Sequence, residues 1–338
     1  MKTAYKCLIA PAVQCHLSRT YSMPVLRSGL SALPIRPHTM NKLSIFHRKV
    51  LRGFLKLSSH SPTPSLYFLL GELPLEARIH MDIFTLFFTI CTNPETTVNK
   101  LVCYLLKMTD NSSTTWSAHV RILAQKYNTP DPLLLIQQPR SFTKESWKTL
   151  IHTKVRAYHE RELREQASKN SKMKFLNVQT TGLTGRPHIA LQSIVTTRDV
   201  AKLRSHLKFL CCDLVTGEIL GRQQGGDPSC RLCLAPLEST EHIIATCRPL
   251  SQIRERLLPE LLNTVKDIAP ECKILADPHS EHLTQFLLDC TSLNLPNGYR
   301  LSPENSGTLK VFKLSRDWCY TLMRERSSKL KALQIGES

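Results

Sequence analysis

Four side chains that commonly bind metal ions lie within residues 230–247, which read CRLCLAPLESTEHIIATC. Cys230 and Cys233 form a C-x2-C pair, and they are followed by His242 and Cys247. Three thiolates and one imidazole make a closed tetrahedral ligand set for Zn²⁺, and sulfur ligands favour zinc over magnesium or calcium. Because four protein ligands leave no coordination position for water, the pattern predicts a structural zinc ion. The alternative interpretation is that these are ordinary buried thiols, since free cysteines are commonly buried.

The residues around this cluster carry turn and helix signals. Residues 225–229 read GGDPS, which is typical of a turn that could present the first two cysteines. Ser239 or Thr240 is a suitable N-cap for a short helix that carries His242. Pro249 disfavours helical conformation at the residue before it, so we expect the chain to leave this helix just after the last cysteine and to close the site there.

The charge of the chain is strongly unbalanced. Its 338 residues include 45 Lys and Arg against 27 Asp and Glu, which gives a formal net charge of +18. Such an excess favours a polyanionic partner, either nucleic acid or an anionic membrane surface, although charge can also serve solubility alone. We expect RNA or DNA, bound through phosphates and therefore largely without sequence preference. The candidate contacts near the metal cluster are Arg204, Lys208, Arg222, Arg231, Arg248, Arg254 and Arg256.

Cysteine usage and apolar runs indicate the compartment. The 12 cysteines lack the dense regular spacing of secreted disulfide scaffolds, which favours an intracellular location in the nucleus or cytoplasm. The most apolar run, residues 83–92, is about half the length that a bilayer requires, so no membrane span is expected. Residues 1–71 contain no Asp or Glu, and a lack of acidic residues is typical of mitochondrial transit peptides. This stretch is longer than a transit peptide and is interrupted by prolines, so mitochondrial targeting is not favoured.

Apolar residues recur at helical spacing along most of the chain, whereas strand-like alternation is weak. The fold class is therefore predicted to be mainly α, an irregular helical bundle with a small Cys-Cys-His-Cys module. Helices are expected over residues 43–57, 98–110, 116–127, 199–210, 282–290 and 309–333, with two more beginning near Thr143 and Pro249. A further helical run is expected over residues 66–88, interrupted at Pro74.

Composition suggests four consecutive regions. Residues 1–135 form a basic, helical N-terminal region, and residues 136–220 form a helical linker region that contains a long charged helix. Residues 221–265 contain the zinc-binding module and the helix after it. Residues 266–338 are expected to be a loop-rich tail that ends in a basic helix.

Three segments together carry a resemblance to a known family. The order of LRSHLKFL (203–210), the cysteine–histidine cluster and PLSQIRERLL (249–258) resembles the C-terminal zinc-binding region of reverse transcriptases from non-LTR (LINE-type) retrotransposons. In that family an acidic residue precedes the histidine and an arginine follows the cluster, and Glu241 and Arg254 stand at those positions. Residues 46–80 and 147–165 are similar to the thumb and connector segments. The resemblance implies a nucleic-acid-binding protein of polymerase origin.

The residues that polymerisation requires are absent from the sequence. A polymerase palm needs paired aspartates that hold two metal ions, and the sequence contains no Asp-Asp pair. We therefore expect a chain that begins downstream of the palm and is not itself an enzyme.

Some relatives in that family carry an endonuclease after the cluster, whose site consists of a Pro-Asp pair and a later acidic residue near a lysine. The downstream acids here, Asp277, Glu281 and Asp289, lack such a lysine and are expected to be solvated loop residues.

Two alternatives to nucleic-acid binding remain at this point. The chain could be a zinc-stapled protein–protein adaptor in which exposed apolar helices, above all residues 66–88, contact a partner. It could also be the remnant of a metal-dependent endonuclease that uses Asp277 or Asp289.

Overall fold

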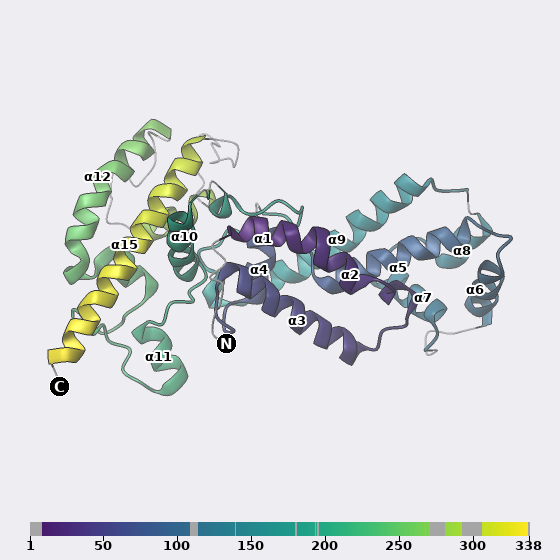
Figure 1. Cartoon of the computed structure of the whole chain (residues 1–338), viewed down its shortest axis with the longest axis horizontal. Coiled ribbons are helices and arrows are strands. Elements are labelled where there is room, and N and C mark those ends of the chain that lie inside the picture. The colour runs from purple at the N-terminus through teal and green to yellow at the C-terminus, as the bar shows by residue number, and fades with distance from the viewer. Residues whose placement is uncertain are drawn as a thin grey trace.

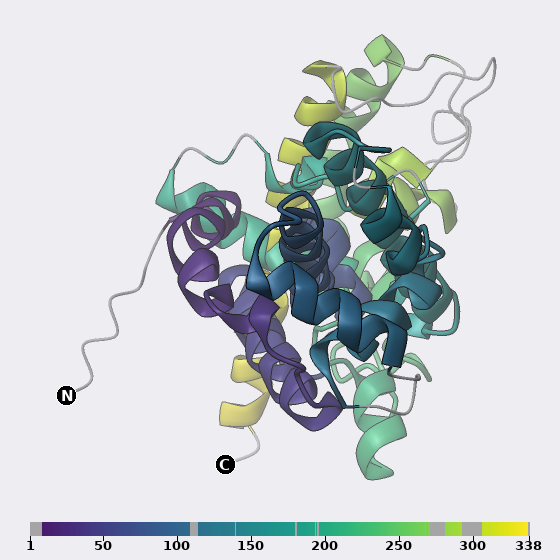
Figure 2. The same ribbon diagram turned by 90° about the vertical axis from the view of Figure 1, so that its right-hand side faces the viewer.

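The computed structural model describes residues 9–108, 114–138, 140–179, 181–192, 194, 196–268, 270, 281–292 and 306–336. Throughout this part of the chain the regular secondary structure is helical, without strands, as the sequence predicts. The molecule is elongated, with the N-terminal helices in one half and the C-terminal helices in the other (Figure 1). Seen from its end, it shows helices that cross at many angles, so the bundle is irregular (Figure 2).

Helices and single helical turns account for the N-terminal half. They are α1 (Pro11–Leu17), η1 (Ser18–Ser22), α2 (Met23–Arg27), η2 (Leu30–Ala32), α3 (Pro37–Leu55), α4 (Thr63–Leu70), α5 (Leu75–Cys91), α6 (Thr97–Met108), α7 (Trp116–Tyr127), α8 (Pro132–Gln137) and α9 (Lys144–Ser168). Helix α6 was expected to end near residue 110, and that position lies outside the described residues.

Capping residues explain where two of these helices begin. Thr115 accepts a hydrogen bond from the backbone of Ala118 and caps α7. Thr143 and Ser146 form a reciprocal capping box at the start of α9, so two otherwise unpaired backbone donors are satisfied. The predictions of a helix over residues 116–127 and of a long helix after Thr143 are confirmed.

The core of the N-terminal half is built around α4 and α5. Both helices are largely buried, and α5 packs against α3, α7 and α9. Trp147 of α9 stacks on Phe88 with ring centroids 5.7 Å apart, and its indole nitrogen donates to the carbonyl of Phe84 at 3.1 Å. The apolar side chains of residues 66–88 therefore form the core. The adaptor hypothesis was wrong to offer them as an exposed surface.

The C-terminal half contains both longer and very short elements. They are η3 (Ser171–Met173), η4 (Ile189–Leu191), α10 (Thr197–Leu210), α11 (Gly217–Gln224), η5 (His242–Thr246), η6 (Arg248–Leu250), α12 (Ser251–Ile268), α14 (Glu281–Asp289), η7 (Cys290–Ser292) and α15 (Ser306–Gly336). Helix α10 begins two residues earlier than predicted, because Thr196 is the N-cap and Asp199 completes the capping box from the third position.

Helix α15 is the central element of this half. It packs against α10, α12 and α14, and it buries Val311, Trp318 and Leu322 as the sequence predicts. The helix expected at the end of residues 266–338 is thus present, and it contacts three other helices of this half. Much of the expected loop, residues 271–280 and 293–305, lies outside the described residues.

The packing does not follow the four predicted regions. Helix α9 packs on α4, α5 and α7, whereas α10 packs on α14 and α15, so residues 136–220 are shared between the two halves. The turn at residues 182–187 contacts the N-terminal half, where Gly185 donates to the carbonyl of Gly71 at 2.8 Å. A Cβ at Gly71 would lie 2.1 Å from the carbonyl oxygen of Arg186, so only glycine fits this contact.

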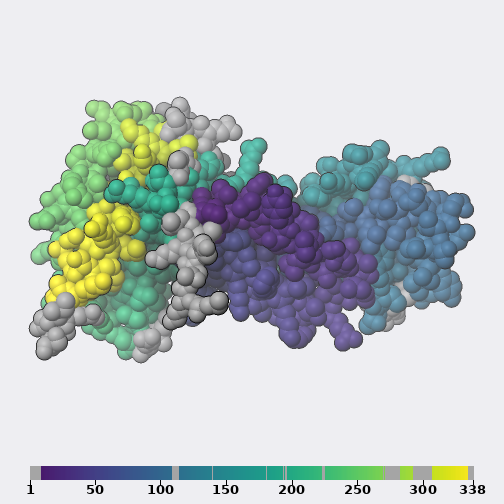
Figure 3. Space-filling model, viewed as in Figure 1, coloured from purple at the N-terminus to yellow at the C-terminus, as the bar shows by residue number. Residues whose placement is uncertain are grey.

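Within the described part of the chain, no helix has both the length and the apolar character needed to cross a membrane. The space-filling view shows the N-terminal helices, in purple, on the surface between the two ends of the molecule (Figure 3).

Candidate metal centre

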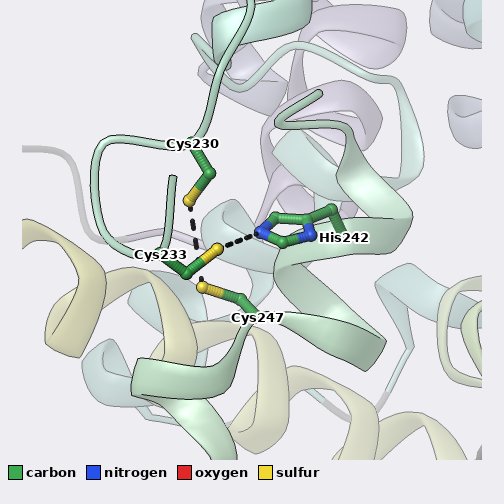
Figure 4. A group of neighbouring side chains, drawn as sticks. All are labelled: Cys230, Cys233, His242 and Cys247. Carbon is green, nitrogen blue, oxygen red and sulfur yellow. Dashed lines mark hydrogen bonds between the residues drawn. The ribbon is translucent and has the colours of Figure 1, made fainter. Parts of the chain in front are cut away.

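The four predicted ligands come together in space. Cys230 and Cys233 lie on the loop after α11, His242 begins η5, and Cys247 follows η5 directly (Figure 4). All four ligand atoms lie within 4.8 Å of one another. The sulfurs of Cys230 and Cys247 are 3.9 Å apart, and Cys233 Sγ is 3.2 Å from His242 Nε2. Zn–S bonds of about 2.3 Å in a tetrahedron place two sulfurs roughly 3.8 Å apart, so the cluster fits a metal ion such as zinc.

A tight turn presents the first two cysteines. The amide of Leu234 donates to the carbonyl of Cys230 at 2.7 Å, and the amide of Cys230 donates to the carbonyl of Ala235 at 2.8 Å. The backbone amides of Leu232 and Cys233 also point at the Cys230 sulfur and donate to it. The turn closes only because Leu234 adopts a left-handed conformation with φ of 59°, which is unfavourable for a leucine.

The histidine is oriented from both sides. Ser239 accepts a hydrogen bond from the His242 amide at 3.1 Å, so Ser239 rather than Thr240 starts this helical turn. Thr246 Oγ1 lies 3.1 Å from Nδ1 of the ring, which leaves Nε2 directed at the thiols. If Nδ1 carries the proton and donates it to Thr246, the Nε2 lone pair is free to bind a metal, which is a common arrangement around ligating histidines. The adjacent Glu241 forms an ion pair with Lys174.

The last cysteine is held by a buried arginine. The chain leaves the helical turn at Cys247 as predicted, with extended φ and ψ of −60° and 111°. Arg248 begins the next turn, η6, and helix α12 begins at Ser251, two residues after the predicted start at Pro249. Arg254 donates to the carbonyl of Cys247 at 2.6 Å. Its side chain is only 8% exposed, so the prediction that Arg254 contacts nucleic acid is not supported by its position.

Burial raises the pKa of two of the metal-free thiols, Cys230 and Cys247. The pKa of Cys247 rises to about 12, with a further contribution from the neighbouring Cys230 and Cys233. Burial also lowers the pKa of His242. A divalent ion that enters this cluster of three sulfurs and one imidazole would stabilise the thiolates and displace the thiol protons.

A buried carboxylate beside the cluster was not predicted from the sequence. Glu238 Oε1 lies 3.7 Å from the Cys230 sulfur, and Oε2 accepts from the Gly217 amide at 2.8 Å. Arg326 of α15 donates to both carboxylate oxygens, at 3.0 and 2.8 Å. The pair therefore ties the metal loop to the central helix. A residue 88 positions away leaves no local signal in the sequence, so this contact could not have been found from spacing.

The predicted nucleic-acid contacts differ in exposure. Four of them are exposed and two, on α10, are half-buried, while Arg254 is buried as described. The exposed residues are Arg222, Arg231, Arg248 and Arg256, and the half-buried ones are Arg204 and Lys208. Arg222 forms an ion pair with Glu218 at 2.6 Å. Arg231, Arg248 and Arg256 are exposed and form no ion pair with another described residue, although Arg231, after the hydrogen bonds from Ser229, helps to lower the pKa of Asp227.

Of the three acidic residues named downstream of the cluster, Asp289 is the one whose side chain the structure describes. Asp289 is fully buried, accepts a hydrogen bond from the amide of Asn177 at 2.8 Å, and lies 3.5 Å from His188 Nε2. Burial opposes its ionisation, but His188 and the hydrogen bonds outweigh it and lower the pKa of Asp289. The prediction of a solvated loop acid was wrong for Asp289. Asp277 lies outside the described residues, and Glu281 begins α14.

The arrangement is that of a closed metal-binding cluster fixed by its own backbone and by two arginines. Comparison with known proteins adds no family to this description, because no family model, curated protein or solved structure matches the chain.

Proposed function

We propose that this protein is a nucleic-acid-binding protein in which a structural zinc ion organises a basic surface. The observation that carries the proposal is the convergence of three cysteines and one histidine to within 4.8 Å in a chain of net charge +18. The protein would act in the nucleus or cytoplasm, where thiols stay reduced. It would bind polynucleotides without copying or cutting them.

The chemistry of the ligands supports zinc among the divalent ions. Soft sulfur donors exclude magnesium and calcium, and the four positions are filled by protein atoms, as in structural zinc sites. Zinc in such a cluster would hold the loop of residues 228–248 in one conformation, because metal binding and local folding are coupled.

The position of two arginines connects the metal to nucleic-acid binding. Arg231 directly follows Cys230 and Arg248 directly follows Cys247, and both side chains are exposed. A bound metal would therefore fix the backbone from which both cations project. Cations placed in this way contact phosphates and read no sequence, so RNA and DNA of any sequence should bind.

We also propose that the chain derives from the C-terminal region of a LINE-type reverse transcriptase. Two residues that match the zinc-binding motif of that family are evidence for this origin, because each holds a part of the cluster in place. Arg254 holds the carbonyl of Cys247, and Glu241, next to the ligand His242, pairs with Lys174.

Salt-dependent binding tests the function. Fluorescence anisotropy would measure the affinity of the full chain for 20-nucleotide single-stranded RNA, single-stranded DNA and duplex DNA between 50 and 200 mM NaCl. If about four phosphates are contacted, duplex affinity should fall roughly 100-fold over this range. An affinity that stays flat would reject nucleic-acid binding and favour a protein adaptor.

Matched substitutions locate the surface. Arg231→Gln and Arg248→Gln should each weaken binding and reduce the salt slope by about one. Arg140→Gln is the control, since Arg140 is exposed and follows α8 in the N-terminal half, away from the cluster. If all three variants bound alike, the surface would lie elsewhere and the metal would have no part in binding.

A further inference from the structure

An apolar groove lies on the N-terminal half, far from the metal cluster in the chain. It has a volume of about 960 Å³ and runs between the segment from α1 to α2 and helix α3. We call it the N-terminal groove. Two rows of apolar side chains at four-residue spacing line its walls, Leu17, Tyr21 and Val25 on one side and Phe46, Val50 and Phe54 on the other.

These side chains are more exposed than a folded monomer requires. Val25 is 77% exposed and Phe46 is 55% exposed, although both belong to regular apolar rows. Helix α3 buries a different face, which includes Leu51 and Leu55, so the row from Phe46 to Phe54 is left open to the groove. A contiguous exposed apolar surface of this kind marks an interaction site.

A buried histidine in the groove lacks a hydrogen-bond partner. His47 lines the groove and is only 4% exposed, yet its Nδ1 has no partner among the described residues. Buried polar atoms in native proteins are almost always hydrogen-bonded. Docking of a peptide that displaces the side chains over this nitrogen would bring a polar group to it, which the hydrocarbon chains of a lipid cannot supply.

The segments that form the groove carry positively charged residues and no acidic ones, although Glu72 and Asp82 from outside these segments pair with Arg19 and Arg27. Residues 9–71, which supply both walls, contain no Asp or Glu. Lys42 and Lys49 are exposed on α3, four residues before Phe46 and three residues after it. An occupant that bears acidic residues beside its apolar side chains would complement this rim, whereas a basic one would be repelled.

We infer that the N-terminal groove is the docking site for an acidic amphipathic helix of a partner protein. Two helical walls with apolar rows at four-residue spacing accept the matching ridge of a third helix. The row from Phe46 to Phe54 is about 12 Å long at 1.5 Å per residue, so two to three turns of the partner fill it. This interaction is independent of nucleic-acid binding, because it uses none of the residues near the metal cluster.

A designed peptide tests the inference on the full chain. The probe is a fluorescein-labelled 14-residue helix with leucines at positions i, i+4, i+7 and i+11 and glutamates on the flanks. It should bind at least 10-fold more tightly than the same peptide with lysines in place of the glutamates. Val25→Asp and Phe46→Asp should each weaken binding at least 10-fold. Both side chains are exposed, so neither change disturbs the core.

Controls distinguish the other occupants. Leu134→Asp changes an equally exposed leucine of α8 and should leave binding unchanged. Deletion of residues 1–8 should leave binding unchanged or strengthen it, and the wild-type chain should stay monomeric by light scattering. The inference is overturned if the acidic peptide binds no better than the basic one, if anionic vesicles bind at the groove in its place, or if Val25→Asp abolishes a dimer of this chain.

Discussion

At the scale of single residues, the metal cluster depends on backbone geometry as much as on its four ligands. The turn between Cys230 and Ala235 directs two amides at one sulfur and closes through the left-handed conformation of Leu234. Glycine is the residue best suited to that conformation, because it lacks the Cβ that clashes there. The leucine is 81% exposed and contributes no packing in return.

Replacing Leu234 with glycine is therefore expected to strengthen metal binding. Relief of left-handed strain is worth about 1 kcal/mol, and since folding of the turn is coupled to the metal, zinc affinity should rise roughly fivefold. Competition with a chelator measures this change. Leu237→Gly is the matched control, because Leu237 is exposed in the same loop without a positive φ, and glycine there should weaken affinity slightly. An equal effect of the two substitutions would contradict the role assigned to the turn.

At the scale of elements, helix caps and apolar periodicity were readable from the sequence. Thr143 and the row of Trp116, Val120, Leu123 and Tyr127 placed two helices correctly, because capping and helical spacing are local properties. The contacts between elements were not readable in this way. The pairing of Glu238 with Arg326 joins residues far apart in the chain, and it makes α15 a support for the metal loop.

Removing the arginine of this pair should weaken the metal centre. Arg326→Met would leave the Glu238 carboxylate buried beside the Cys230 sulfur without a counter-charge, which disfavours thiolate and metal. Zinc affinity should fall about 10- to 100-fold, the usual range for groups that support a ligand. Glu238→Gln in the same chain should recover part of the loss.

The neighbouring Arg324→Met provides the control, since Arg324 is exposed on the same helix. Chelator competition on the wild-type chain, the single variants Arg326→Met and Glu238→Gln, and the double variant gives the coupling between the two side chains. If Arg326→Met and Arg324→Met had the same affinity, the metal loop would not depend on α15.

At the scale of the whole molecule, the helical fold class and the convergence of the four potential metal ligands were predictable from the sequence, whereas the division into four regions stays a prediction. The ligands were predictable because their spacing is short and their chemistry is specific. Helices α9 and α10 pack on opposite halves, and residues 66–88 are buried, because of tertiary contacts. Apolar content alone does not show whether a helix is buried by such contacts or exposed on the surface. Asp289 was misjudged for the same reason, since its partner His188 is distant in the chain.

Buried histidines in both halves predict that the protein loses stability in acid. Burial lowers the pKa of His47, His159 and His206 to about 4 and that of His80 to about 3. An unfolded histidine has a pKa near 6.5, so between pH 6.5 and about 4 the unfolded state binds more protons, and stability falls as pH falls. Each such group contributes about 1.4 kcal/mol per pH unit when fully titrating.

Denaturant unfolding at several pH values measures this slope. His206→Gln should reduce the slope by about one proton, because glutamine does not titrate and its amide can still donate to the carbonyl of Leu288, which His206 Nε2 contacts at 2.9 Å. His60→Gln alters an exposed ring and is the control. Stability that is constant from pH 7 to pH 5 would contradict the buried, neutral histidines of this fold.

The central claim is that one structural metal ion is bound by Cys230, Cys233, His242 and Cys247. The most direct measurement is the zinc content of the purified chain by elemental mass spectrometry, combined with hydrogen exchange over residues 228–248. We expect about one zinc per wild-type chain, close to none in Cys233→Ser with loss of exchange protection in that loop, and full occupancy in Cys103→Ser, whose thiol lies on α6. A wild-type chain that takes up no zinc, or a Cys233→Ser variant that keeps both the metal and the protection, would contradict it.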